Sequence, residues 1–429
     1  MKVTSFSRIV MAVVLGLSLV GFTAAWQASQ AFASPESTVQ AAQASSKASK
    51  PSAGQLKAFK KATGDFSLEL FQRCVAAKGK NANVTVAPLS VLNALAVSAN
   101  GAAGKMSAQM RKVLGDGASI STINKNLKWF NGHLVNSKKA KLDIANAIWY
   151  HNGKSLTMNK SFIARAKKYY KAGVTAADFS DPSTAGSINS WVAKKTHNMI
   201  KKVVDNLQAA DRVVLVNAMY FDAKWLSPFE KELTRKGTFT TASGQKHKVK
   251  MMHDTESSYL NRNGVVGFIK PYAKGYSYVA LLPKKGTSLK SFVKKLDGNT
   301  FRKFLATESH EEVRVTMPKY SVTYSNDSME RQLADMGMPL AFSQERADFS
   351  KMGKDANGNL YIGAVIHKTK VDVDEAGTKA AAATAMVVKA SSAPIAKPKV
   401  VKLNRPFVYA IIDNSTKIPL FIGTVSNIG

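Results

Sequence analysis

Two segments contain part of a motif that would support zinc or phosphate chemistry. Residues 309–312, Ser-His-Glu-Glu, begin like the helical zinc site of a metalloprotease, but the second histidine is missing. Residues 101–107 include a Gly-Lys pair like that of a phosphate-binding loop. Ala99 stands where the first glycine of such a loop belongs, and Met106 stands where Ser or Thr would contact Mg²⁺. Neither segment therefore predicts a metal or nucleotide site.

Other common catalytic and metal-binding patterns are also incomplete. Residues 355–359 look like the start of a calcium loop, but Leu360 and Ile366 replace the glycine and the bidentate glutamate that the loop needs. The sequence has no Gly-x-Ser-x-Gly elbow, and its seven histidines are scattered. We therefore assign no catalytic residue and no metal ligand from these motifs, which disfavours an ordinary hydrolase or metalloenzyme. An active site built from residues distant in the sequence stays open as the alternative.

The stretch from Glu375 to Val400 has an unusual composition. It has too few large apolar residues for a core element and too little charge for an ordinary solvated loop. With a period of two, one face carries small and then apolar groups: Thr378, Ala380, Ala382, Thr384, Met386 and Val388. Such a face suits a sheet interior, and Gly377 supplies a flexible hinge. The pattern indicates a loop that could also become a strand, although a flexible linker or an alanine-rich helix is the alternative.

The first 33 residues have the order of a secretory signal. Lys2 and Arg8 precede a nearly continuous apolar run from Ile9 to Ala25, and small residues follow at 31 and 33. The alternative is a membrane anchor, but the run is shorter than the roughly 20 residues of a spanning helix. We expect a secreted, extracellular protein with no membrane span, with retention at the cell surface as a variant of this expectation.

Residues 34–54 are rich in Ala, Ser, Lys and Gln and predict a low-complexity spacer. One domain, residues 55–429, follows. Its single cysteine, Cys74, lies on an apolar helical stripe and is predicted to be a buried, inert thiol that cannot pair within the chain.

The domain begins with helical patterns and continues with strands. Helices are predicted at 55–78, 90–98, 105–114 and 189–204. Strands are predicted at 213–221, 278–282, 313–324, 406–412 and 420–425, the last two joined as a hairpin by a turn-rich link. No regular alternation of strand and helix is present, so the pattern favours the α+β class.

The composition is strongly basic, with 61 Lys and Arg against 28 Asp and Glu. Such a surface attracts polyanions. The lysines are spread along the whole chain, and no RNA-binding signature is present, so no specific nucleic-acid site is predicted.

Several segments, in order along the chain, resemble those of one family. These are 83–90 (Asn-Val-Thr-Val-Ala-Pro-Leu-Ser), 95–104, 215–229, 317–320 (Met-Pro-Lys-Tyr), 347–350 (Ala-Asp-Phe-Ser), 365–368, 375–384 and 404–407 (Asn-Arg-Pro-Phe). The sequence resembles the serpins over about residues 55 to 427. Segment 375–384 is similar to the hinge of the inhibitory members.

The resemblance implies a serpin fold with three β-sheets, eight or nine helices and an exposed reactive loop at about 375–405. It also implies a suicide substrate of serine proteases rather than an enzyme. The protease cleaves the loop, the loop inserts into the central sheet, and the protease stays trapped as a covalent acyl-enzyme. No cofactor is needed.

The resemblance also assigns roles to individual residues. The loop hinge comprises Glu375, Gly377, Thr378, Ala380, Ala382 and Thr384. The sheet-opening cluster comprises Ser90, Asn217, His367, Trp225 and Lys319. Lys319 is expected to pair with Glu375. Ala87 departs from the family, which usually has serine there, and so removes a hydroxyl from this cluster.

The family's usual interval from Glu375 places the scissile bond between Ser391 and Ser392. Counting back from Asn404 gives a point about four residues later, so the loop is longer than usual. Cleavage at Ser391 or the adjacent Ala390 suits elastase-like or subtilisin-like proteases, whereas cleavage after Lys389 suits trypsin-like enzymes. Two alternative functions remain. The first is a non-inhibitory serpin that acts as a chaperone or carrier, and the second is a surface protein that binds polyanions through its basic residues.

Overall fold

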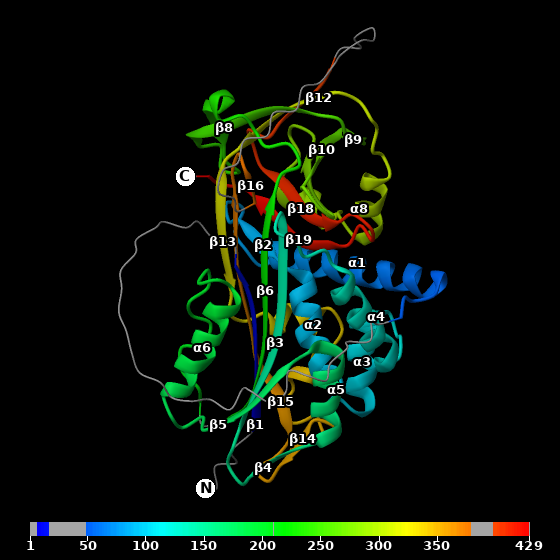
Figure 1. Cartoon of the computed structure of the whole chain (residues 1–429), viewed down its shortest axis with the longest axis vertical. Coiled ribbons are helices and arrows are strands. Elements are labelled where there is room, and N and C mark those ends of the chain that lie inside the picture. Colours follow the sequence, from blue (N-terminus) through cyan, green and yellow to red (C-terminus); the bar gives the residue numbers. More distant parts are fainter. Residues whose placement is uncertain (1–6, 17–48, 209, 379–397, 429) are drawn as a thin grey trace.

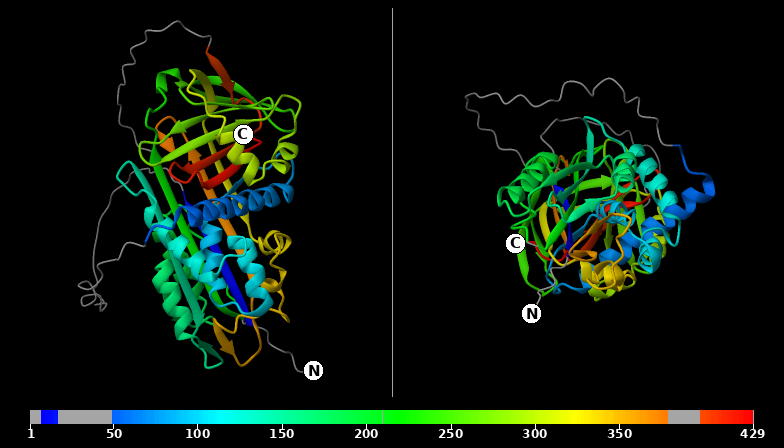
Figure 2. Two further views of the ribbon diagram at one scale, coloured as in Figure 1. Left: turned by 90° about the vertical axis from the view of Figure 1, so that its right-hand side faces the viewer. Right: turned by 90° about the horizontal axis from the view of Figure 1, so that it is seen from below.

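The computed structural model describes residues 7–16, 49–208, 210–378 and 398–428. Its elements form a mixed α+β fold, as predicted, in which three larger sheets are combined with helices (Figure 1). Helices α2 (Pro88–Ala99) to α5 (Lys160–Tyr170) lie beside the lower part of the long central strands, and the six-stranded and four-stranded sheets lie toward the other end (Figure 2). Within the described residues, no helix is long and apolar enough to cross a membrane.

The central sheet has seven strands. Along the main path they are β1 (Ser7–Gly16), β15 (Leu360–Val373), β16 (Gly377–Thr378), β6 (Asp211–Lys224), β3 (Ala140–His151) and β5 (Gly173–Ala177); β13 (Tyr320–Asn326) pairs with β15. β1 also pairs with β6, so β1 and β16 both lie between β15 and β6. β1 falls within the residues that we predict to be a secretory signal, and that assignment stays a prediction.

Three further sheets, each smaller than the central sheet, complete the strand framework. The six-stranded sheet has the order β2 (Val84–Val86), β19 (Pro419–Val425), β18 (Phe407–Asp413), β11 (Tyr276–Leu282), β10 (Val265–Pro271) and β9 (Tyr259–Arg262). The four-stranded sheet has the order β17 (Lys399–Lys402), β12 (Val313–Pro318), β8 (Lys246–Glu256) and β7 (Arg235–Thr240). β14 (Gly353–Asp355) pairs with β4 (Leu156–Met158).

The described α-helices fall in two groups, one before residue 196 and one between residues 289 and 335. They are α1 (Ala53–Ala76), α2 (Pro88–Ala99), α3 (Gly104–Gly115), α4 (Ile120–His133), α5 (Lys160–Tyr170), α6 (Ser183–Lys195), α7 (Leu289–Lys294), α8 (Gly298–Leu305) and α9 (Glu330–Asp335), with 3-10 turns η1 (Lys231–Leu233) and η2 (Pro339–Phe342). α1 begins inside the predicted spacer because Ser52 and Gln55 cap it reciprocally.

Strand β6 joins two hydrophobic cores because its side chains alternate between faces. Val213, Leu215 and Phe221 contact the main core, which includes the fully buried helix α2. Val214 and Val216 face a second core beneath α6. β6 is therefore covered on both faces, and its apolar sequence reflects this burial.

Two predicted elements differ from the structure. The helix predicted at 189–204 ends at Lys195, because His197 and Asn198 adopt positive φ angles of 50° and 63°. The strand predicted at 313–324 is two strands, β12 and β13, which lie in different sheets. The predicted C-terminal hairpin is confirmed, with β18 and β19 antiparallel.

Candidate functional site

The site lies where β15 ends and the chain turns back into the sheet. After Val373, Asp374 accepts hydrogen bonds at Oδ1 from the backbone N–H groups of Ala376, at 2.9 Å, and Gly377, at 3.2 Å. Burial raises the pKa of the Asp374 carboxyl. This turn directs Gly377 and Thr378 between β15 and β6, antiparallel to both strands.

Gly377 occupies a position that no other residue could adopt without displacement. Its φ of 157° lies in the region that favours glycine. A Cβ atom there would lie 2.3 Å from the Ala223 carbonyl oxygen and 2.8 Å from Lys224 Cα. The predicted hinge glycine is therefore required by close contact with β6 as well as by backbone torsion.

Thr378 is fully buried against aromatic residues. Its hydroxyl lies 2.5 Å from the Tyr272 hydroxyl. Tyr272 stacks on Trp225, with ring centroids 4.4 Å apart and planes inclined by 10°. The indole N–H of Trp225 donates to the Asp374 carbonyl oxygen at 2.9 Å. Trp225 and Tyr272 thus fix both the turn and the first inserted residue.

Glu375 connects this turn to neighbouring elements. Its Oε2 lies 2.6 Å from Lys319 Nζ, and its Oε1 accepts a hydrogen bond from the Thr234 hydroxyl at 3.0 Å. Its carbonyl oxygen accepts from the Phe229 N–H at 2.8 Å. Burial acts to raise the pKa of Glu375, but the hydrogen bonds from Lys319 and Thr234 outweigh it and lower the pKa.

This lowered pKa predicts a loss of stability in acid. The ionised Glu375 contributes stability above its unfolded pKa, and the contribution is lost as the pH falls through the lower folded pKa. Glu375→Gln should therefore lower the melting temperature at pH 7, by an amount equivalent to about 1 kcal/mol because Lys319 is partly exposed. The difference should shrink as the pH falls from 5 toward 3, because Glu375 becomes protonated. Thermal melts across this pH range, with Glu345→Gln as a surface control, provide the check; an unchanged difference at pH 3 would contradict it.

A second group of polar residues lies farther down the sheet. Ser90 of α2 is hydrogen-bonded to Asn217 of β6, and Asn217 donates to Asn146 of β3 at 2.7 Å. His367 of β15 accepts at Nε2 from the Ala87 backbone N–H at 3.3 Å. All of these side chains are buried. The backbone N–H of Ala87 thus makes the link to His367 at the position where the family usually supplies a hydroxyl.

Comparison with known proteins assigns the chain to a family. Residues 61–428 match the family model described as Serpin (serine protease inhibitor). The chain belongs to the serpin family. An uncharacterized serpin-like protein of Thermococcus kodakarensis is 33% identical over 87% of each chain.

Solved structures support the same assignment for the fold. The thermophilic serpin tengpin in its native state matches with a TM-score of 0.80 and 42% identity, over 86% of this chain and 94% of that one. Native protease nexin-1 with heparin matches with a TM-score of 0.74 and 25% identity, over 87% of this chain and 99% of that one. The predicted family and fold class are confirmed.

The serpin structure divides the predicted sheet-opening cluster into two groups. Trp225 and Lys319 lie with the hinge, whereas Ser90, Asn217 and His367 form the lower group. Asn217 precedes Ala223 by six residues, which corresponds to roughly 20 Å along β6. The sequence suggested a single cluster because motif order along a chain carries no distance information.

Several predicted residues of the serpin's loop cannot be placed. The hinge positions Ala380, Ala382 and Thr384, and the candidate cleavage positions Lys389, Ala390, Ser391 and Ser392, lie outside the described residues. Their assignments stay predictions.

Sequence reasoning missed a buried ionic cluster beside the hinge. Lys270 is 1% exposed, and its Nζ lies 2.7 Å from Asp254 Oδ2 and 2.5 Å from Glu256 Oε1. The same ammonium lies 4.3 Å from the ring centroid of Phe229 and 5.6 Å from that of Trp225. Burial raises the pKa of Glu256 to about 7, against the opposing effect of Lys270. The cluster therefore supports the aromatic residues on which the hinge rests.

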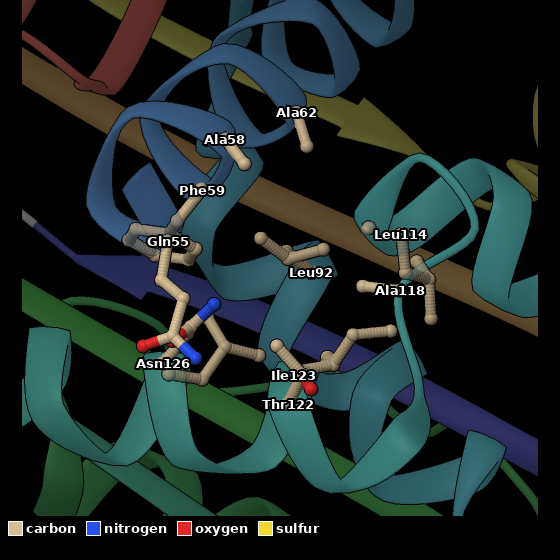
Figure 3. Close-up of a pocket in the computed structure, with 12 residues that line it drawn as sticks. Gln55, Ala58, Phe59, Ala62, Leu92, Leu114, Ala118, Thr122, Ile123 and Asn126 are labelled. Atoms are coloured by element: carbon tan, nitrogen blue, oxygen red, sulfur yellow. The ribbon is translucent and has the colours of Figure 1, made fainter. Parts of the chain in front are cut away.

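A pocket elsewhere in the serpin has a different character. It lies among α1, α2 and α4, near the end of α3, and its lining includes Phe59, Leu92, Leu114 and Ile123 (Figure 3). Its twelve lining residues, all in the described part of the chain, include no charged side chain. We therefore do not assign the function to this pocket.

Proposed function

We propose that this serpin is a suicide-substrate inhibitor of serine proteases. The observation that carries the proposal is β16, because Gly377 and Thr378 already lie between β15 and β6 in the direction that a returning loop requires. The chain beyond Thr378 has small side chains at alternate positions, so it can extend this strand. Insertion of the rest of the loop would continue an arrangement that the fold has begun.

The proposed chemistry is ordinary acyl transfer to the protease serine that stops at the acyl-enzyme ester. The protease serine Oγ bonds to the carbonyl carbon of Ser391, and the amide bond to Ser392 breaks as the new amine takes up a proton. The ester remains because the freed loop moves into the sheet and carries the protease with it before water can attack. The small side chain of Ser391 favours elastase-like or subtilisin-like proteases, and Lys389 offers the alternative for trypsin-like ones.

The test mixes the purified protein with elastase, a subtilisin and trypsin. A covalent band that survives denaturation, with the mass of the protease plus the cleaved serpin, is expected with at least one of them. Mass spectrometry of the released C-terminal peptide then identifies the scissile bond. A protease with its active-site serine blocked serves as the control and should give no band. Complete cleavage without any covalent band, using protein that lacks the N-terminal leader, would favour a non-inhibitory carrier or chaperone.

We also propose that the protein is secreted, because residues 1–33 have the order of a cleavable signal. N-terminal sequencing of protein recovered outside producing cells should begin at Ser34. Recovery of uncleaved chain in the membrane fraction would instead indicate an anchor.

A second proposed property is polyanion binding, supported by one surface of the four-stranded sheet. Strands β7 and β8 present four exposed lysines, which are Lys236, Lys246, Lys248 and Lys250. Lys236 and Lys250 are direct cross-strand partners, although like charges in such pairs repel. Among the described residues, none of the four has an ion-pair partner within 4.0 Å. We call these residues the lysine surface.

An acidic polysaccharide is the partner that this surface fits best. A polyanion would relieve the repulsion among the lysines, and protease nexin-1, a relative by structure, has been solved with heparin. The sheet also contains β17, where the described chain resumes after the reactive loop. A polysaccharide bound here would lie near the end of the chain segment that a protease attacks.

The lysine surface predicts salt-dependent binding to heparin. Replacing Lys236, Lys248 and Lys250 by serine should lower the salt concentration that elutes the protein from immobilised heparin, because fewer counterions are released on binding. The matched control replaces Lys160, Lys167 and Lys168 of α5 and removes the same net charge. Equal shifts for the two triple variants would show that only overall charge matters and would contradict a specific surface. Preferential retention on nucleic acid would contradict the choice of polysaccharide.

A further inference from the structure

The N-terminal strand β1 occupies the middle of the central sheet. It pairs in parallel with β15 from Ser7 to Val14 and with β6 from Arg8 to Gly16. Figure 1 shows β1 as the dark blue strand running along the centre of the sheet beside β6 and β15. Because both of its edges are paired, β1 is an interior strand and not an added edge strand.

The reactive loop enters the sheet in the same position between β15 and β6, from the opposite end. Thr378 pairs with Ala223 and with Val373, and the loop enters antiparallel to β6. Each further inserted residue would lie opposite a position one residue earlier in β6. The third residue beyond Thr378 would therefore lie opposite Tyr220, and the twelfth would lie opposite Asp211.

These positions of β6 already pair with β1. Tyr220 pairs with Gly16, and Asp211 pairs with Arg8. A hydrogen-bonding edge of β6 can pair with only one strand at each position. Complete insertion of the loop up to a cleavage site near Ser391 is therefore incompatible with β1 in place. The hinge residues Gly377 and Thr378 fit beside β1 because β1 ends before it reaches them.

We infer that β1 fills the position in the central sheet that the reactive loop must enter. The chain can therefore trap a protease only when residues 7–16 are out of the sheet. This inference rests on the proposed trapping function. A chain that retains β1 would be cleaved by the protease but would release the protease, because β1 fills the position between β15 and β6 that the loop must enter. Cleavage after Ala33 during export would give a domain that folds without β1, and would thereby couple inhibitory activity to removal of the leader.

The direct test is a proline at position 13 of the full-length chain. Val13 lies in the middle of β1, where proline would remove a backbone donor from an interior strand. The expected result is a covalent complex with the protease for Val13→Pro, and mainly cleaved serpin with active protease for the wild-type chain. A proline at Val3, which precedes the strand, is the matched control and should behave as wild type.

Thermal melting tests, without a protease, whether β1 occupies the sheet. Val13→Pro should melt at a lower temperature than wild type, because an occupant that binds only the folded state stabilises it. A synthetic peptide of residues 7–16 should raise the melting temperature of Val13→Pro and suppress its trapping, whereas the same peptide with proline at position 13 should do neither. Should Val13→Pro fail to fold, a specific protease site placed within residues 38–44 allows β1 to be cut from folded full-length protein, and the detached peptide is then removed by dilution before trapping is measured.

The outcomes separate this inference from the proposed function. Efficient trapping by the wild-type full-length chain would overturn the inference and leave the function supported. If neither form traps but the peptide raises the melting temperature, the occupancy holds and the inhibitory function fails. If the melting temperature responds neither to the variant nor to the peptide, β1 is not an occupant and the inference is overturned.

Discussion

Replacing Thr378 by arginine should convert the proposed protease inhibitor into a substrate. Thr378 is fully buried, and its hydroxyl contacts Tyr272 beneath the point where the loop enters the sheet. An unpaired guanidinium at this position would cost several kcal/mol, and each 1.4 kcal/mol changes the ratio of two outcomes by about tenfold. The number of inhibitor molecules consumed for each protease inactivated should therefore rise by about tenfold or more. Titration of residual protease activity measures this number.

Two further measurements test whether Thr378→Arg acts on insertion of the loop. The first-order cleavage of the loop should be little changed, because the substitution lies thirteen residues before the proposed scissile bond. Thr378→Ser keeps the hydroxyl and should retain most of the trapping. If Thr378→Arg trapped the protease as well as the parent protein, entry of residue 378 into the sheet would not be required for inhibition. All of these proteins should carry the substitution in a chain without β1.

The second large effect is expected from Lys270→Met. The ammonium of Lys270 neutralises Asp254 and Glu256 in a region from which water is largely excluded. Its removal leaves two carboxylates facing each other near Trp225, and breaking such buried pairs costs about 3–5 kcal/mol. We expect a lower melting temperature at pH 8 and partial recovery near pH 5. The recovery follows because the raised pKa of Glu256 lets the folded protein take up a proton that the unfolded chain releases.

A double variant provides the matched control for Lys270→Met. Adding Glu256→Gln removes one of the stranded charges, and the double variant should regain part of the lost stability at pH 8. Its melting temperature should also depend less on pH between 5 and 8. A double variant less stable than Lys270→Met alone at pH 8 would show that Glu256 has a favourable role that does not depend on the lysine.

Much of the architecture could be predicted because its signals are local. The apolar stripe of α1 has helical spacing, and the two apolar runs of β18 and β19 flank a turn-rich link. The helix near residue 190 was misplaced because apolar spacing continues past Lys195. The positive φ angles of His197 and Asn198, which end it, have no strong sequence signal.

The candidate site was predicted only in part because its contacts cross between sheets. The resemblance supplied Gly377, Thr378, Glu375 and Lys319, whose motifs are short and ordered along the chain. It gave no indication of Tyr272, which lies 106 residues before its hydrogen-bonding partner Thr378. Lys270, Asp254 and Glu256 likewise look like ordinary charged residues in the sequence, since burial is a property of the folded chain.

The position of β1 illustrates a limit of sequence patterns. An apolar run such as Ile9 to Ala25 has the composition of a leader segment and, over part of its length, that of a buried strand. The pattern does not distinguish the two states. The segment would act as an occupant in a chain that folds with it attached, and as a leader in a chain that is exported before it folds.

The six-stranded sheet has a consequence for the order in which the protein can fold. Its strand β2, residues Val84–Val86, pairs with Thr424 to Ile422 of β19, which is separated from it by more than 330 residues of chain. β18 lies between β19 and β11, so this sheet cannot close until nearly the whole domain has been synthesised. Contacts of such long range slow folding. The emerging chain therefore remains without a finished core while the ribosome is at work, and the export proposed above would require such an unfolded chain.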